Sequence, residues 1–292
     1  MGKQKKKKER FNFIKTVKLA YEETQRSSVI IYVILRLLVI LCLILQIIKG
    51  DFTSAALCLL SIILLAIPVF VQSKFKITLP NGLEIAIYLF VFAAEILGEI
   101  NNFYGIIPFW DSLLHVINGF LAAAIGFSMV DLLNSNSDKF NLSPFYLCLV
   151  AVCFAVTIGV IWEFIEYGAD KYFKLDMQKD KIVEQISSVM LNENNENKTV
   201  IISGIDKTVL LDEEGNVLYE IEGGYLDIGI SDTMKDLLVD FIGAFVFSIF
   251  GYFELKNKKP GFIHNFVPQS KKREMPVKVS EELDKIYSKK QE

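Results

Sequence analysis

The stretch Val29–Ile48, VIIYVILRLLVILCLILQII, decides the class of this protein, because in it a single charge, Arg36, interrupts an otherwise apolar run. A helix that crosses a bilayer needs about 20 mostly apolar residues. Of the 292 residues, 52% are hydrophobic and the formal net charge is only −3, and the apolar residues gather in further blocks of this kind. This segregation excludes an ordinary water-soluble domain, a disordered chain and a disulfide-stapled secreted scaffold.

Six apolar blocks predict an all-α polytopic membrane protein with six transmembrane helices. The predicted spans are Val29–Ile48, Thr53–Val71, Leu83–Ile100, Trp110–Leu133, Phe145–Tyr167 and Asp232–Phe253. Between the last two spans lies one long connection, with short β-branched or apolar runs separated by turn formers, which predicts a small β-meander. The predicted strands are Thr199–Ser203, Lys207–Leu211 and Asn216–Ile221, and the polar part 176–198 is expected to be helical or loose.

The charges outside the spans predict the orientation, since Lys and Arg accumulate on the cytoplasmic side of a membrane. Residues 1–27 hold nine Lys/Arg against three acids, 256–292 hold ten against five, and 169–231 hold six lysines against thirteen acids. We therefore predict a multi-pass protein of the bacterial inner membrane with both termini in the cytoplasm. The predicted parts are a basic tail (1–27), five transmembrane helices (28–168), an extracytoplasmic insertion (169–231), the sixth helix (232–255) and a second basic tail (256–292).

Membrane lipid is the expected partner of such a protein, and its basic residues do not indicate nucleic-acid binding. Five lysines lie within Lys3–Lys8. This run is explained by a topology signal on a solvated tail, and it can also contact anionic lipid.

Nine ionisable side chains from four predicted spans fall near the outer face of the membrane. They are Glu95, Glu99, Asp111, His115, Glu163, Glu166, Asp232, Asp236 and Asp240. Helix positions four apart differ by about 40°, so these residues form stripes on single helix faces. A carboxylate near the bilayer centre costs about 2.5–3.5 kcal/mol, and the stripes are therefore expected to face a polar interior.

Three explanations fit this acidic group: a bound divalent cation, a protonatable network without metal, and a structural network that joins helices. Oxygen ligands with one imidazole suit Mg²⁺, Mn²⁺, Ca²⁺ or iron. For a metal, we predict ligands among Asp111, His115, Glu163, Asp236, Glu95, Glu99 and Asp232, with Glu166 or Asp240 as the general base. Asp111 and Asp232 can instead cap the helices that they begin. Lys235, the one nearby cation, is predicted to lie off the Asp stripe.

Other polar or small residues in the spans have simpler readings. Gly119 and Gly243 predict close approach of two helices, a common use of small residues in membranes. Asn118 is expected to form a hydrogen bond within the bundle. Glu84 falls at the cytoplasmic face and is predicted to be unrelated to the acidic group.

Three segments carry a resemblance to a known group. They read FYGIIPFWDSLLHVING (Phe103–Gly119), WEFIE (Trp162–Glu166) and DTMKDLLVDFIG (Asp232–Gly243). Together they resemble the YjdF-like bacterial membrane proteins, which are reminiscent of the VanZ-like proteins associated with low-level glycopeptide tolerance. That group has no established activity, so the resemblance implies a membrane location and a fold.

The leading functional hypothesis is a metal-dependent site at the outer leaflet that hydrolyses, or transfers a group on, a cell-envelope lipid or its head group. Two alternatives stay open. Intramembrane carboxylates also mark ion pathways, so the protein can be a cation- or proton-coupled transporter, although most charges lie at one face. It can also be a non-catalytic module of envelope stress or antibiotic tolerance whose outer insertion binds a partner.

Overall fold

The structure, a computed structural model, describes residues 26–75, 77–135, 142–194, 196–257, 261–267 and 269–270. The lysine run Lys3–Lys8, most of the first predicted basic tail and the part of the second tail after residue 270 lie outside the described residues. The predictions for the tails therefore remain predictions.

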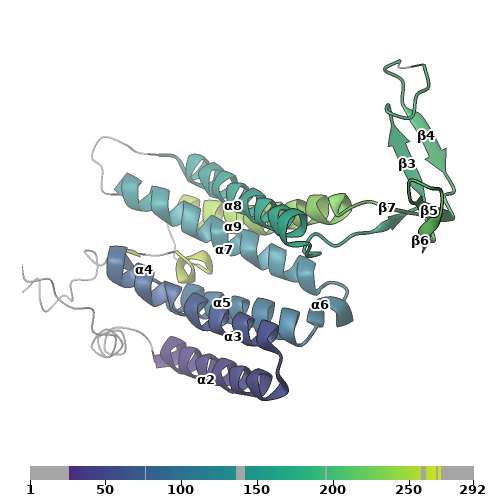
Figure 1. Cartoon of the computed structure of the whole chain (residues 1–292). Helices are drawn as coiled ribbons and strands as arrows, with labels where there is room; N and C mark the ends of the chain where they lie inside the picture. The colour runs from purple at the N-terminus through teal and green to yellow at the C-terminus, as the bar shows by residue number, and fades with distance from the viewer. Residues whose placement is uncertain are drawn as a thin grey trace, which may run out of the picture. The chain divides into compact units, whose positions relative to one another are not determined.

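The described chain is mostly helical, and six of its eight short strands, β2 to β7, lie between the last two long helices (Figure 1). The other two strands, β1 and β8, pair with each other. The helices are α2 (Arg26–Lys49), α3 (Phe52–Leu64), α4 (Ile67–Phe75), α5 (Asn81–Val91), η1 (Phe92–Ile100), α6 (Phe103–Ile106), α7 (Trp110–Ser135), α8 (Pro144–Phe173), α9 (Ile230–Asn257) and η2 (Ile263–Asn265). The strands are β1 (Ile77–Thr78), β2 (Ile182–Val183), β3 (Gln185–Ser188), β4 (Val200–Ser203), β5 (Lys207–Leu211), β6 (Val217–Glu222), β7 (Tyr225–Leu226) and β8 (Gln269–Ser270).

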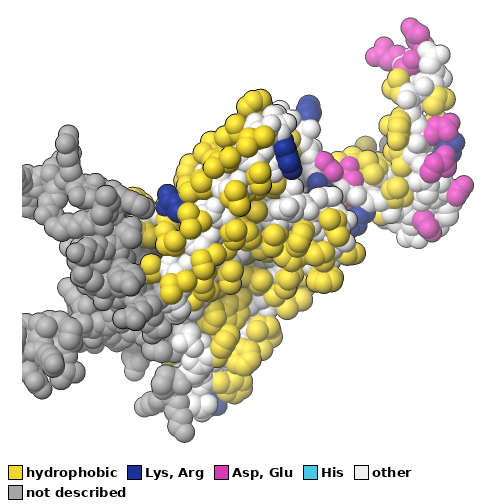
Figure 2. Space-filling model, turned by 90° about the horizontal axis from the view of Figure 1, so that it is seen from below, with side chains coloured by type: hydrophobic (Ala, Val, Ile, Leu, Met, Phe, Trp, Pro, Cys, Tyr) yellow, Lys and Arg dark blue, Asp and Glu magenta, His cyan; other side chains and the backbone are white. Residues whose placement is uncertain are grey.

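Among the described residues, five helical segments are long and apolar enough to cross a membrane. They are Ser27–Lys49, Phe52–Lys74, Trp110–Asn134, Pro144–Phe173 and Ile230–Asn257. Their outward side chains are apolar, as Leu37 and Ile48 illustrate with exposed fractions of 61% and 75%, and hydrophobic side chains cover much of the face seen in Figure 2. Each of these candidate spans coincides with one of the six predicted spans.

The remaining predicted span, Leu83–Ile100, is helical but is built from two helices of different kinds. It begins as the 11-residue α-helix α5 and continues as η1, a nine-residue π-helix. Its role as a sixth span stays a prediction. π-Helical turns are rare and often occur at functional sites. Glu95 and Glu99 both lie on η1.

The second predicted span is also interrupted. We expected one helix over Thr53–Val71, but α3 ends at Leu64 and α4 begins at Ile67. Pro68 explains the break, because a proline ring clashes with the carbonyl of the residue four positions earlier and lacks a donor N–H.

The chain divides into two compact units, with the boundaries inside α8 and α9. The first unit is 1–155 with 240–292, and the second is 156–239. In the first unit α2, α3, α5 and η1 share a hydrophobic core formed by Leu35, Val39, Cys58, Leu65, Tyr88 and Ile96.

The second unit holds the insertion, whose strands form separate antiparallel pairs. β2 pairs with β7, β3 with β4, and β5 with β6, each as a two-stranded sheet. All three predicted strands are present, but the predicted meander is wrong because β4 and β5 do not pair. The expectation of a helical or loose segment at 176–198 is wrong at 182–183 and 185–188, where β2 and β3 lie, and it holds for the other described residues, which form neither helix nor strand. Local sequence patterns indicate where a strand lies, but they do not indicate which other strand it pairs with.

The start of α3 gives a prediction on acid stability. Asp51 is the N-cap residue and accepts hydrogen bonds from Ser54 N at 3.0 Å and Ser54 Oγ at 2.6 Å. These bonds lower the pKa of Asp51. An acid with a lowered pKa stabilises the fold above its unfolded-state pKa of about 3.9, and this stability is lost as the pH falls through the folded-state value.

We expect Asp51→Ala to lower the melting temperature in detergent at pH 7. Asp51→Asn should retain the cap at pH 7, because Asn is an equally good N-cap, but should flatten the pH dependence between pH 5 and about 2. Equal melting curves for the wild type and Asp51→Ala would contradict this assignment.

Candidate metal centre

The backbones of α7 and α9 touch at two glycines, and this contact positions the candidate site. A Cβ on Gly119 would lie 2.0 Å from the carbonyl oxygen of Asp240, and a Cβ on Gly243 would lie 2.0 Å from that of Val116. Only glycine permits so close an approach, and small residues commonly allow it between membrane helices. The predicted close approach is therefore confirmed, and Asp240 itself lies at the point of contact.

The imidazole of His115 lies between two carboxylates, with one ring nitrogen toward each. His115 Nδ1 is 3.4 Å from Asp240 Oδ2, and His115 Nε2 is 3.6 Å from Asp111 Oδ1. Asn118, one turn further along α7, donates to Asp240 Oδ1 at 3.1 Å. The predicted bundle hydrogen bond of Asn118 is thus present, and it binds the candidate site itself.

These distances suggest different roles for the two carboxylates. Both oxygens of Asp240 have a partner, and its position at Nδ1 favours the tautomer that carries the proton there. The nitrogen facing Asp111 would then carry the lone pair with which an imidazole binds a metal ion. The separation of 3.6 Å between His115 Nε2 and Asp111 Oδ1 is long for a hydrogen bond. It suits two ligands that each lie about 2.1 Å from one shared metal ion.

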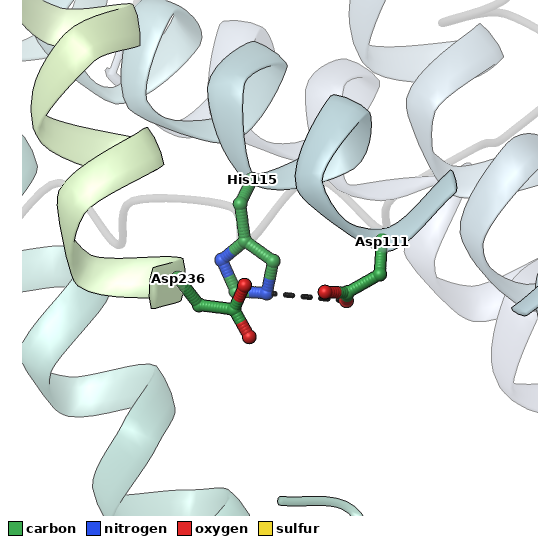
Figure 3. Close-up of side chains that lie close together, drawn as sticks. All are labelled: Asp111, His115 and Asp236. Carbon is green, nitrogen blue, oxygen red and sulfur yellow. Dashed lines mark ion pairs between the residues drawn. The ribbon is translucent and has the colours of Figure 1, made fainter. Parts of the chain in front are cut away.

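Asp236 precedes Asp240 by one turn on the unbroken helix α9, which places both on one helix face. One ligand atom each from Asp111, His115 and Asp236 lies within 4.8 Å of the other two, so these residues could hold a metal ion (Figure 3). The exposed fraction is 2% for Asp236 and 8% for His115, whereas the Asp111 side chain is 32% exposed, so two of the three residues are shielded from solvent.

Asp232 has a different environment from the other acids of its stripe. It accepts a hydrogen bond from Lys179 N at 3.0 Å, and its Oδ1 is 3.6 Å from Lys181 Nζ and 3.6 Å from Lys235 Nζ. Lys235 also lies 3.4 Å from Asp236 Oδ1. The expectation that Lys235 lies off the Asp stripe is therefore wrong, because its long side chain reaches back to both aspartates.

Glu163 and Glu166 lie on α8 and are both buried. Trp162 Nε1 donates to Glu166 Oε1 at 2.8 Å, and Gln178 Nε2 lies 3.5 Å from Glu163 Oε2 and 2.5 Å from Thr233 Oγ1. The indole of Trp162 thus orients the Glu166 carboxylate one turn along α8. Gln178 was missed, because an amide in a polar loop carries no sequence signal for such a contact.

Glu95 and Glu99 lie on η1, with Glu95 half-buried and Glu99 exposed. Within the described part of the chain, the group able to hold a metal does not include them. Their predicted role as ligands remains a prediction, as does that of Glu163.

Glu84 was set aside on sequence, yet it is one of the most buried charges of the first unit, at 5% exposure. Its Oε1 accepts from Gln72 Nε2 and from Tyr88 OH, each at 3.0 Å. Its Oε2 is buried and lacks a hydrogen-bond partner among the described residues. The available signal was Tyr88 four residues after Glu84, on the same helix face.

We compared the chain with known protein families, proteins and solved structures. A family model described as "Predicted membrane protein (DUF2238)" matches residues 30–257. An uncharacterized protein of Thermotoga maritima is 30% identical over 93 residues, which cover 32% of this chain and 46% of that protein. The chain thus matches about half the length of that relative. No solved structure matches the chain.

The glycine contact between α7 and α9 gives a prediction on stability. Gly119→Ala must move the Asp240 carbonyl from 2.0 Å to an ordinary contact of at least 3.4 Å, which pushes α7 and α9 apart. Overpacking of this kind costs about 1–3 kcal/mol, so the melting temperature in detergent should fall.

Gly168→Ala is the matched control, because a Cβ there meets nothing within 4 Å. It should leave the melting temperature unchanged or raise it slightly, since Ala is the better helix former. Equal behaviour of the two variants would show that the α7–α9 contact is looser than described.

Proposed function

The chain belongs to the DUF2238 family of predicted membrane proteins, and we propose that its α7–α9 contact binds a divalent metal ion used on a lipid of the cell envelope. This family comprises the YjdF-like proteins, so that resemblance is confirmed. The more distant likeness to VanZ-like proteins stays a prediction. As several apolar helices also indicate, the protein is a multi-pass membrane protein.

The observation that carries the proposal is the placement of His115 between Asp240 and Asp111. Histidines that bind metals almost always donate their other ring N–H to a carboxylate or carbonyl, which fixes the tautomer and strengthens the ligand. Asp240, bound also by Asn118, has this position at Nδ1. We therefore assign Asp240 to orienting His115, in place of the general base considered from sequence.

His115, Asp111 and Asp236 are the proposed ligands. Two carboxylates and one imidazole suit Mg²⁺, Mn²⁺, Ca²⁺ or Fe²⁺ better than a closed structural zinc site, which has four nitrogen or sulfur ligands. Three protein ligands leave positions for water or substrate oxygen. Asp232 is left out of the set, because Lys181 Nζ and the backbone N–H of Lys179 already engage its two carboxylate oxygens, and among the described residues the group that could hold a metal does not include it.

The proposed chemistry is hydrolysis or group transfer at an anionic lipid head group. A divalent ion supplies Lewis acidity and lowers the pKa of bound water. Glu166, oriented by the Trp162 indole, is the proposed base that removes a proton from the attacking oxygen. Membrane burial favours a lipid substrate, and the predicted orientation places the site toward the outer leaflet.

The first test is metal content. Elemental analysis of purified wild-type protein should find about one divalent ion per chain, and His115→Ala and Asp236→Asn should lose it. Asp240→Asn should weaken metal binding about 10–100-fold in titrations with Mn²⁺, because such outer partners tune the ligand. Asp176→Asn, an exposed acid of the insertion, is the control and should bind like the wild type.

If His115→Ala and Asp236→Asn lose the metal but melt like the wild type, the result would support these residues as ligands. If the wild type binds no divalent ion, or if all variants bind Mn²⁺ equally, the proposal is wrong.

A second candidate function, cation- or proton-coupled transport, is favoured by Glu84. A buried carboxylate whose Oε2 lacks a partner among the described residues costs about 1–3 kcal/mol, and a proton or cation bound at Oε2 would remove this cost. Intramembrane acids mark ion and proton pathways. Glu84 lies at the other end of α5–η1 from Glu99, and its predicted position at the cytoplasmic face would give an ion pathway a buried acid on that side.

Flux in proteoliposomes tests this second candidate. Proton or Mn²⁺ uptake should fall at least tenfold in Glu84→Gln, while metal bound at the α7–α9 contact should be unchanged. Tyr88→Phe keeps the ring and removes the hydroxyl donor to Glu84, so it should reduce flux less. Absence of flux in the wild type, or equal flux in Glu84→Gln, would exclude transport through Glu84.

A further inference from the structure

The strands of the insertion leave backbone edges open. β3–β4 and β5–β6 are each two-stranded sheets, so within the described residues every strand of these two hairpins has one unpaired edge. Open edges present N–H and C=O groups in a row that another extended chain can pair with. A two-stranded hairpin is also only marginally stable in water by itself. Both facts favour a further chain beside these strands.

The same hairpins expose large apolar side chains on a segment predicted to lie in water. The exposed fractions are 63% for Ile201, 66% for Leu218 and 65% for Tyr219. In β5–β6, Leu210 pairs with Tyr219 and both are exposed, so this face of the hairpin is uncovered. Contiguous exposed apolar side chains commonly mark a binding surface.

The charge of the hairpins indicates the kind of partner. Residues 182–226 contain nine acids and two lysines. Both lysines are already paired within the hairpins, Lys198 with Glu196 at 2.6 Å, and Lys207 with Glu220 and, at 3.3 Å, with Glu222. Figure 2 shows the acidic side chains interspersed with hydrophobic ones on this segment. An excess of seven negative charges is left for a partner to balance.

We propose that the β3–β6 hairpins bind an extended cationic polypeptide segment, which adds a strand to an open edge. In strand addition, backbone hydrogen bonds supply affinity and alternate side chains supply specificity. A segment that alternates Lys or Arg with apolar residues would place its charges near the acids and its apolar side chains over residues such as Tyr219. The proposal is independent of the metal site.

Three other occupants fit less well. Phosphate-bearing nucleic acid and anionic lipid are repelled by the acidic hairpins. A second copy of the insertion carries the same negative charge. The basic tails of this chain, 1–27 and 256–292, are predicted to lie on the opposite side of the membrane. Charge complementarity therefore favours a separate basic polypeptide.

Peptide binding to the full-length protein in nanodiscs tests the proposal. The probe is a labelled ten-residue peptide with alternating Lys and Val, and fluorescence anisotropy measures its binding. The comparison peptides replace Lys by Glu, or replace two Val by Pro, which cannot donate backbone hydrogen bonds. We expect only the Lys–Val peptide to bind, with affinity that falls as salt rises.

Two variants locate the binding surface. The combined change Glu213→Gln, Glu214→Gln and Glu220→Gln should weaken binding about tenfold, as expected for the loss of three exposed charge contacts. Leu218→Ser with Tyr219→Ser should weaken it by a similar factor, and both sites are exposed, so folding should persist. Asp176→Asn, outside the hairpins, is the matched control and should bind like the wild type.

Several outcomes would overturn the proposal. These are equal binding of the Pro-containing peptide, unchanged binding in both hairpin variants, and binding of anionic vesicles through the hairpins with no binding of the Lys–Val peptide. Dimerisation that the Leu218/Tyr219 variant abolishes, without peptide binding in the wild type, would assign the surface to a second copy of the chain instead.

Discussion

The direct backbone contact of α7 and α9 is the constraint on which the candidate site depends. Lipid cannot solvate polar groups, so buried carboxylates in membrane helices need partners supplied by the protein. Gly119 and Gly243 bring the two helices close enough for Asp240 to reach His115 and Asn118. If α7 and α9 were further apart, Asp240 could not reach His115 and Asn118. The polar contacts therefore depend on the two glycines.

The buried acids of this protein have three different kinds of partner. Asp232 is balanced by lysines and a backbone N–H, and Glu166 by an indole. Asp240 is engaged by His115 and Asn118. Asp236 lies 3.4 Å from Lys235 Nζ, and together with Asp111 and His115 it forms the group that could hold a metal ion. The hydrogen bonds and ion pairs of Asp232 and Glu166 account for their burial without a metal. The candidate metal ligands are therefore Asp111, His115 and Asp236. The hairpins differ again, because most of their acids face solvent and have no internal counter-charge.

Several parts of this picture could be predicted from sequence. Blocks of apolar residues identified five membrane helices, and turn formers delimited three of the strands. Spacing of four residues placed Asp111 with His115 and Asp236 with Asp240 on shared faces, and the two glycines were recognised as sites of close approach. Pro68 was present in the sequence, but the apolar pattern around it suggested one helix where the structure has two.

By itself, the sequence determined that this is a multi-pass helical membrane protein and which of its residues are chemically notable. The approximate position of a helix, its length and its amphipathic face depend on composition and local periodicity, which a single sequence contains. Only the tertiary structure decided the partners: Asp240 at Nδ1 of His115, Lys235 with the aspartates, Gln178 beside Glu163, and Gln72 and Tyr88 around Glu84. Most of these contacts join residues far apart in the chain or depend on side-chain reach. They follow from how helices and loops pack, and local sequence patterns do not specify that packing.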